Sequence, residues 1–208
     1  MIYLSGCVRP DLPPDVGVMM TPMMGNRLPD DRVWAADTGC FAQPAKHDDA
    51  TYLTWLADRA DAAGRCLFAT APDVRPEFSG SPARDTLERS APMFRHIRSC
   101  GFSAALVAQD GLEQERIPWG DFDALFIGGS TAWKLGDACT ALVREANRLG
   151  KWTHQGRVNS LRRLRHVQWQ GCRSADGTFV AFGPDKNIPR VEAWLRALRM
   201  QPQLWEAA

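Results

Sequence analysis

Short apolar segments alternate with longer amphipathic segments along most of the chain. The apolar runs predict β-strands at Ile2–Leu4, Val16–Met20, Val33–Ala36, Cys66–Thr70, Ala104–Ala108, Ala124–Ile127, Lys151–His154 and Arg173–Ala175. Helical spacing and caps predict helices at Ala50–Ala63, Ala83–Ser99, from after Ser130 to Leu149, from an Asn159 or Ser160 cap to Gln170, and at Pro189–Leu198. The strands from Cys66 onward are apolar throughout, which is typical of strands covered on both faces.

This alternation predicts an α/β fold in which helices cover a parallel sheet. A count of about eight strands favours a closed sheet over an open one, so we expect a compact (β/α)8 TIM-type barrel. The 208 residues are close to the lower limit of roughly 200 for such a barrel, so the loops should be short. We expect a single domain over residues 1–200 and a short frayed tail over residues 201–208.

Polar residues or glycines follow six of the predicted strands. They are Asp37-Thr38-Gly39, Thr70-Ala71-Pro72-Asp73, Gln109-Asp110-Gly111, Gly128-Gly129-Ser130, Gln155-Gly156-Arg157 and Asp176-Gly177-Thr178. In a parallel barrel these carboxyl ends share one rim, where barrel enzymes carry their active sites. Each aspartate alone could be a turn former or a helix cap. Their expected convergence on one rim is what predicts a site.

The overall charge gives no sign of a polyanionic partner, since the net charge is +1 at pH 7. Nucleic-acid binding would therefore need a local cluster of basic side chains. The candidates near the rim are Lys134, Arg157, Arg162, Arg163, Arg165 and His166. Phosphate binding is the favoured interpretation for Arg157 and Lys134, while a solvated helix face explains Arg162 and Arg163 equally well.

The cysteines point away from a metal site. All six are scattered, none forms a CxxC or CxC pair, and no histidine stands at ligand spacing from one. We therefore expect no metal and no cofactor. No apolar run approaches the roughly 18 residues that span a bilayer, and no export signal is visible. A cytoplasmic protein with free thiols and no membrane partner is expected.

The polar strand ends, taken in order, resemble the motifs of the tRNA-guanine (queuine) transglycosylases. Asp37-Thr38-Gly39-Cys40-Phe41 resembles the D-S-G-G-F segment of that family, and Asp73 resembles its base-recognising aspartate. Gln109 after AALVA is similar to the Gln of V-Q-G, and Gly128-Gly129 to the G-G loop. The segment from Gly156 to Asp176 is similar to G-x-G-x-P-x-x-(helix)-G-x-D-x-F-D, which ends on the nucleophile of the family.

The resemblance runs from about Trp34 to Asp185, with three departures. Cys40 replaces a glycine, Ser130 replaces an apolar residue, and the C-terminal zinc-binding cysteine cluster of the tRNA enzymes is missing. The chain looks most like the short phage-type relatives, which insert 7-deazaguanine bases into DNA. This implies a barrel without a zinc subdomain, DNA rather than tRNA as the polymer, and the host cytoplasm as the location if a phage encodes it.

The resemblance also implies roles for the rim residues. Asp176 would be the nucleophile and Asp37 the general acid/base. The base would be held by Asp73, Gln109, Thr38, Gly128 and the backbone N–H of Gly129, and Phe41 or Trp133 could stack on it. A nucleic acid and a free 7-deazaguanine base would be the partners, and the oligomeric state stays open.

Three alternatives remain. The polymer could be tRNA, or the enzyme could be a nucleoside or nucleic-acid glycosidase that ends the reaction with water. In the third, the chain is a non-catalytic nucleic-acid-binding protein whose polar rim no longer performs chemistry.

Overall fold

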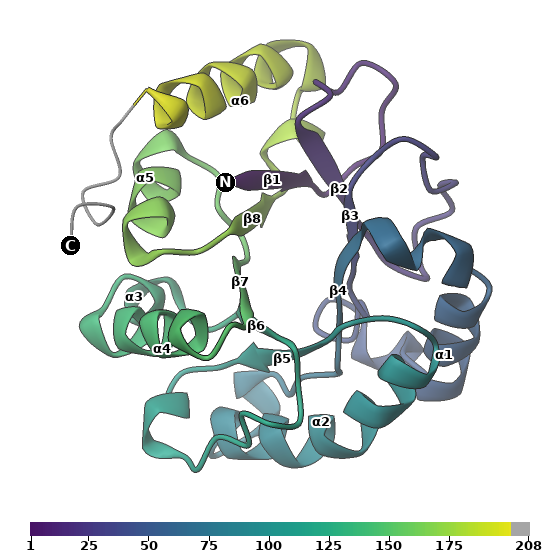
Figure 1. The fold of residues 1–208 in the computed structure, drawn as a ribbon, viewed down its shortest axis with the longest axis vertical. Helices are drawn as coiled ribbons and strands as arrows, with labels where there is room; N and C mark the ends of the chain where they lie inside the picture. Colours follow the sequence, from purple (N-terminus) through teal and green to yellow (C-terminus); the bar gives the residue numbers. More distant parts are fainter. Residues whose placement is uncertain (201–208) are drawn as a thin grey trace.

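Eight parallel strands close into a barrel in chain order, from β1 to β8 (Figure 1). The computed structural model describes residues 1–200. The strands are β1 (Ile2–Ser5), β2 (Val16–Met20), β3 (Trp34–Ala36), β4 (Cys66–Thr70), β5 (Ala104–Ala108), β6 (Ala124–Ile127), β7 (Trp152–Gln155) and β8 (Ser174–Gly177). Strand β8 pairs with β1, with Asp176 opposite Leu4, and this pair closes the barrel. The predicted TIM-type barrel is confirmed.

Helices cover the barrel after five of the strands, the same five as predicted. The α-helices are α1 (Asp49–Ala57), α2 (Pro82–Ser99), α3 (Thr131–Lys134), α4 (Asp137–Arg148), α5 (Leu161–Gln170) and α6 (Pro184–Arg199). Short 3₁₀ helices lie at Pro44–Lys46, Ala60–Arg65, Pro76–Phe78, Leu112–Gln114 and Phe179–Ala181. In the described residues, the connections after β1, β2 and β5 hold no α-helix. Leu12, Leu28 and Leu112 from these connections are buried and cover the strands instead.

Some predicted helix bounds were wrong. The helix predicted at Ala50–Ala63 ends at Ala57 and continues after a break as a 3₁₀ helix. The helix predicted up to Leu149 is divided at Gly136, where the backbone is extended. The last helix begins at Pro184 and not at Pro189, because Pro184 occupies the first turn, where a missing N–H costs nothing. Over residues 1–200, no helix has both the length and the apolar character needed to span a bilayer.

The core has two layers, because successive strand residues face opposite sides. One layer lies between the strands and the covering segments and includes Tyr3, Trp34 and Leu106. The other fills the barrel interior, with Leu4, Met19, Ala35, Phe68, Ala105 and Ala124 as its buried members. On β7 and β8 three interior positions are polar: His154 packs against Phe68 and hydrogen-bonds to both Ser174 and Asp176. The polar side chains of the barrel interior therefore lie on its β7–β8 side.

Candidate active site

A cavity of about 140 Å³ lies at the carboxyl ends of the strands. Its lining residues are Asp37, Phe41, Asp73, Val107, Phe126, Gly128, Gly156, Arg157 and Asp176. The structure thus brings together the three aspartates that the sequence places after β3, after β4 and at β8. Pockets for drug-sized ligands measure roughly 300–1,000 Å³, so this cavity suits one small chemical group.

Asp37 lies where β3 ends, and a neutral hydroxyl donates to its carboxylate. Its backbone N–H donates to the carbonyl of Met20 at 2.8 Å, which fixes the residue at the rim. The hydroxyl of Thr70 donates to Oδ1 of Asp37 at 3.1 Å. Burial, together with the charge of Asp73, raises the pKa of Asp37 to about 6. Asp37 can therefore hold or release a proton near neutral pH.

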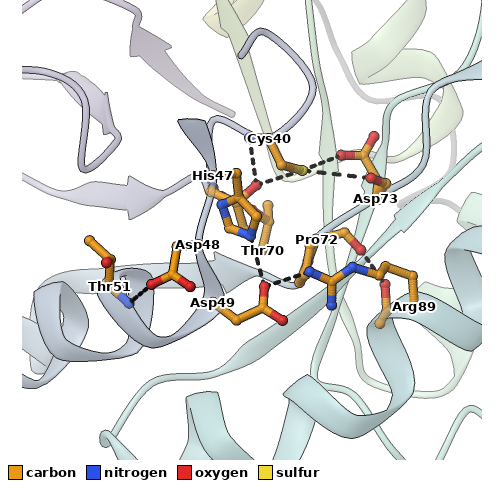
Figure 2. Close-up of polar contacts among 11 residues, drawn as sticks. Cys40, His47, Asp48, Asp49, Thr51, Thr70, Pro72, Asp73 and Arg89 are labelled. Atoms are coloured by element: carbon orange, nitrogen blue, oxygen red, sulfur yellow. Dashed lines mark hydrogen bonds and ion pairs between the residues drawn. The ribbon is translucent and has the colours of Figure 1, made fainter. Parts of the chain in front are cut away.

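Asp73 is held by two donors, one on each carboxylate oxygen. The amide of Gln109 donates to Oδ2 at 2.6 Å, and the thiol of Cys40 donates to Oδ1 at 3.1 Å. Figure 2 shows Cys40 pointing at Asp73. Burial and the charge of Asp73 raise the pKa of Cys40 to about 12, so the sulfur keeps its proton and remains a donor. A carboxylate has about four acceptor sites, so Asp73 can still accept N–H groups from a ligand.

Gln109 and Thr38 lie behind this carboxylate and do not line the cavity. Gln109 is 1% exposed. The Thr38 hydroxyl donates to the sulfur of Cys40 at 3.0 Å, and its backbone N–H donates to the Thr70 hydroxyl at 3.1 Å. Both residues were predicted to touch the base. The structure gives them a different position, in which they orient Asp73 and Asp37.

The segment that carries Cys40 is attached to two helices below it. Asp49 at the start of α1 accepts from Arg89 of α2 at 2.6 Å and pairs with His47 at 2.8 Å (Figure 2). The side chain of Asp48 caps α1 by accepting from the backbone N–H of Thr51 at 2.7 Å. These contacts fix the loop after β3, and with it the orientation of Cys40.

Asp176 lies within β8 and not beyond it. Its carboxylate therefore reaches the cavity from the part of the barrel interior next to the carboxyl ends of the strands. His154 contacts its Oδ1 through Nε2 at 2.9 Å. Gly156 leaves room for this pair, because a Cβ atom there would come within 2.9 Å of the Phe126 ring and 3.3 Å of Oδ1 of Asp176. Glycine is therefore required at this point of close approach.

The glycine loop after β6 is fully engaged in backbone hydrogen bonds. The N–H groups of Gly128 and Gly129 both donate to the carbonyl of Ala108, at 2.9 and 3.1 Å. A side chain at Gly129 would overlap Asp110 and Trp133. The prediction that the Gly129 N–H binds the base is thus not matched by this geometry, because that N–H already has an acceptor. Gly128 does line the cavity.

Arg157 closes one side of the cavity in an unusual backbone conformation. Its φ of 61° is the only positive value at a non-glycine residue in the described part of the chain. Its guanidinium donates to the carbonyls of Gly128 and Gly129 at 2.5 and 2.6 Å, and it lies 5.7 Å from the centre of the Phe41 ring. The side chain is exposed, so it can still meet a phosphate at the rim.

Lys134 was predicted to bind phosphate, and the structure corrects this. The side chain is 3% exposed, and its ammonium donates to the carbonyl of Gly156 at 2.8 Å. Burial, together with the charge of Arg157, lowers the pKa of Lys134 to about 8. Lys134 supports the loop that carries Arg157 and lies out of reach of a solvent-side phosphate. Arg162 is exposed, and Arg163 makes only long contacts of 3.4 and 3.5 Å with Thr131 and Arg157.

Three of the residues around the site that were not predicted from the sequence bear on its chemistry. Phe126 lines the cavity, and His154 holds Asp176. Arg75, in the long loop after β4, lies 5.4 Å from the centre of the Phe41 ring. A titratable residue at a strand position that the two-residue alternation places inward could have pointed to His154. No comparable pattern marks Arg75.

A larger cavity of about 880 Å³ lies at the opposite end of the barrel, beside Ile2, Trp152 and Arg173. Within residues 1–200 its lining includes no carboxylate, whereas the smaller cavity is lined by three. Among residues 1–200, no three His, Cys, Asp or Glu side chains gather in a way that could hold a metal ion.

Comparisons with known proteins support the fold. No protein-family model matches the sequence, and no curated protein matches it. A solved structure described as native KDPGal shares 12% identity and a TM-score of 0.50, over 83% of this chain and 72% of that one. At such low identity the likeness concerns the barrel alone.

Two further structures are similar over a smaller share of their own length. The Bacillus subtilis YkuI protein, with an EAL domain and in complex with substrate c-di-GMP and calcium, has a TM-score of 0.43 and 13% identity. The match covers 84% of this chain and 45% of that one. The Klebsiella pneumoniae BlrP1 calcium/cy-diGMP complex has a TM-score of 0.40 and 17% identity, over 71% of this chain and 38% of that one.

Proposed function

We propose that this protein is a base-exchange transglycosylase that replaces guanine in DNA with a free 7-deazaguanine base. The observation that carries the proposal is the meeting of Asp37, Asp73 and Asp176 in one small cavity, each with different hydrogen-bond partners. Base exchange needs a nucleophile, a proton carrier and a base-recognising acceptor. The three aspartates fit these three roles.

In the first half-reaction, a carboxylate oxygen of Asp176 attacks C1′ of the target nucleotide. The C1′–N9 bond breaks, and its electron pair leaves with the base. A sugar–Asp176 ester forms through an oxocarbenium-like transition state. Asp37 in its protonated form donates its proton to the leaving base, which departs as neutral guanine. A pKa of about 6 keeps part of the Asp37 population protonated near neutral pH.

In the second half-reaction, Asp37 is a carboxylate and accepts the proton of the incoming 7-deazaguanine. The nitrogen of that base attacks C1′, and the bond to Asp176 breaks with its electron pair returning to the carboxylate. Both aspartates are then in their starting states, so no cofactor is consumed.

Recognition of the base is assigned to Asp73 and Phe41. Asp73 would accept the amino and ring N–H groups of guanine, and the wrong base would leave this buried carboxylate without those donors. Phe41 lines the cavity and would stack on the ring. In a duplex, the target nucleotide must first leave the base stack. Arg157 and Arg163 at the rim would then meet the backbone phosphates.

The proposal is tested with DNA that carries radiolabelled guanine. Purified protein is incubated with this DNA, with and without a 7-deazaguanine such as preQ0, and free label is measured beside mass spectrometry of the DNA nucleosides. Without acceptor we expect at most one labelled guanine released per enzyme molecule, from formation of the Asp176 ester; with acceptor we expect multiple turnovers and a deazaguanine nucleoside in the product. The Asp176→Asn variant is the matched control, with binding to the same DNA measured in parallel.

Each other result selects an alternative. Release of label without acceptor beyond one equivalent of enzyme would identify a glycosidase that ends with water. Exchange into tRNA but not DNA would overturn the choice of polymer. DNA binding without exchange or hydrolysis would favour a non-catalytic nucleic-acid-binding protein.

A further inference from the structure

A chain of buried hydrogen bonds runs through the barrel interior and ends at Asp176. The indole N–H of Trp152 donates to the hydroxyl oxygen of Ser174 at 2.8 Å. The same hydroxyl lies 2.8 Å from Nδ1 of His154, and Nε2 of His154 lies 2.9 Å from Oδ1 of Asp176. Ser174 and His154 are fully buried, so water cannot replace these partners.

The direction of each hydrogen bond in this chain follows from its first donor. An indole N–H can only donate, so the Ser174 oxygen is an acceptor toward Trp152. The single Ser174 proton then has Nδ1 of His154 as its acceptor within the described residues. With Nδ1 accepting, the ring proton sits on Nε2, and Nε2 donates to Asp176. Every polar group is satisfied in this arrangement.

Other proton arrangements leave a buried group unsatisfied. With the proton on Nδ1, the Nε2 lone pair would face the Asp176 carboxylate, and the Ser174 hydroxyl proton would lose its acceptor. With both nitrogens protonated, the Ser174 proton again has no acceptor. A buried polar group without a partner is costly. The Phe68 and Phe126 rings, with centres 5.0 and 4.7 Å from the His154 ring, offer no replacement acceptor.

We propose that His154 is a positioning residue that, as the neutral Nε2–H tautomer, holds Oδ1 of Asp176 and leaves Oδ2 as the attacking atom. Within residues 1–200, Oδ1 is the Asp176 oxygen that accepts a hydrogen bond from a side chain. Fixing one oxygen also fixes the carboxylate plane, and it leaves Oδ2 without a side-chain donor in the described part of the chain. The kinetic consequence rests on the proposed function, whereas the tautomer does not.

The first test is nitrogen NMR of the wild-type protein, which needs no turnover. The chain has four histidines, so a His154→Gln spectrum identifies the His154 signals. We expect a proton on Nε2 and none on Nδ1 at neutral pH. In the Ser174→Ala variant, which removes the donor to Nδ1, we expect the Nδ1–H form to appear as well. A doubly protonated ring or an Nδ1–H tautomer in the wild type overturns the proposal, whether or not base exchange is detected.

The second test compares His154→Gln with His154→Phe in the exchange assay. Glutamine keeps an N–H donor near the position of Nε2, whereas phenylalanine keeps the ring shape and removes the donor. We expect the Phe variant to lose about 10- to 100-fold in kcat with KM nearly unchanged, and the Gln variant to recover most of that loss. Equal losses in the two folded variants would mean that His154 only fills space.

Discussion

Two carboxylates line the same cavity and are surrounded by different groups. Asp37, on the β3 side, accepts from the Thr70 hydroxyl and lies near the charge of Asp73. Asp176, on the β8 side, accepts from an imidazole in a fully bonded chain. The Asp37 surroundings favour a proton, and the Asp176 surroundings favour a fixed orientation. Different surroundings within one cavity therefore suit two aspartates to different proposed roles, Asp37 to acid/base catalysis and Asp176 to nucleophilic attack.

The largest expected effect comes from a substitution of Asp176, on the β8 side of the cavity. Asp176→Asn removes the nucleophile and should lower kcat for base exchange by about 10³-fold or more. Denaturing gels should show a covalent DNA–protein adduct with the wild-type protein and none with the variant. Affinity for DNA should change little, because Asp176 lies in the cavity and carries no positive charge that would bind a phosphate. A variant that still forms the adduct would place the nucleophile elsewhere.

The next effect concerns the β3 side. Asp37→Asn should lower kcat by about 10²- to 10⁴-fold, as expected for loss of a general acid/base. In the wild type, kcat/KM for guanine release should fall about tenfold per pH unit above pH 6, because Asp37 loses its proton there. The residual kcat/KM of Asp37→Asn should not show this fall above pH 6. The same fall above pH 6 in the wild type and in Asp37→Asn would mean that another group titrates there.

A smaller effect of the same substitution is on stability. The pKa of Asp37 is raised from 3.8 to about 6 in the folded protein, so the folded state binds more protons between these values. Asp37 therefore destabilises the fold progressively as pH rises from about 4 to 6, with the full penalty above pH 6. At about 1.4 kcal/mol per pH unit, Asp37→Asn should raise the free energy of unfolding by about 2 to 3 kcal/mol at pH 7.5. Urea unfolding measures this, and no gain should appear at pH 3.

The smallest effect lies outside the carboxylates. Each phosphate contact contributes about 0.9 to the slope of log K against log salt concentration. Arg163→Ala should reduce the slope for DNA binding by about one such contact and weaken binding a few-fold at low salt. Arg95→Ala, an exposed change on α2, is the matched control and should leave the slope unchanged. Equal slopes for the wild type, Arg163→Ala and Arg95→Ala would mean that Arg163 makes no contact with DNA phosphates.

The sequence predicted the barrel and the three aspartates because both depend on local patterns. Each apolar run such as Ala104–Ala108 lies at its predicted place, and parallel closure brings the strand ends together. Local patterns do not predict the direction of a side chain whose partner lies on another element of the fold. Lys134 points inward to the carbonyl of Gly156, and Gln109 points to Asp73. Nothing in the flanking residues indicates either partner, since both are remote in the sequence.

The closing strand pair has a consequence for how the site comes into being. Asp176 stands on the last strand, which pairs with the first strand of the barrel, and contacts between such distant segments form slowly. An intermediate in which β8 has not docked has neither the cavity nor the His154–Asp176 contact. The proposed base exchange would therefore not precede completion of the barrel during biosynthesis, and a partly folded chain would have no means to open glycosidic bonds.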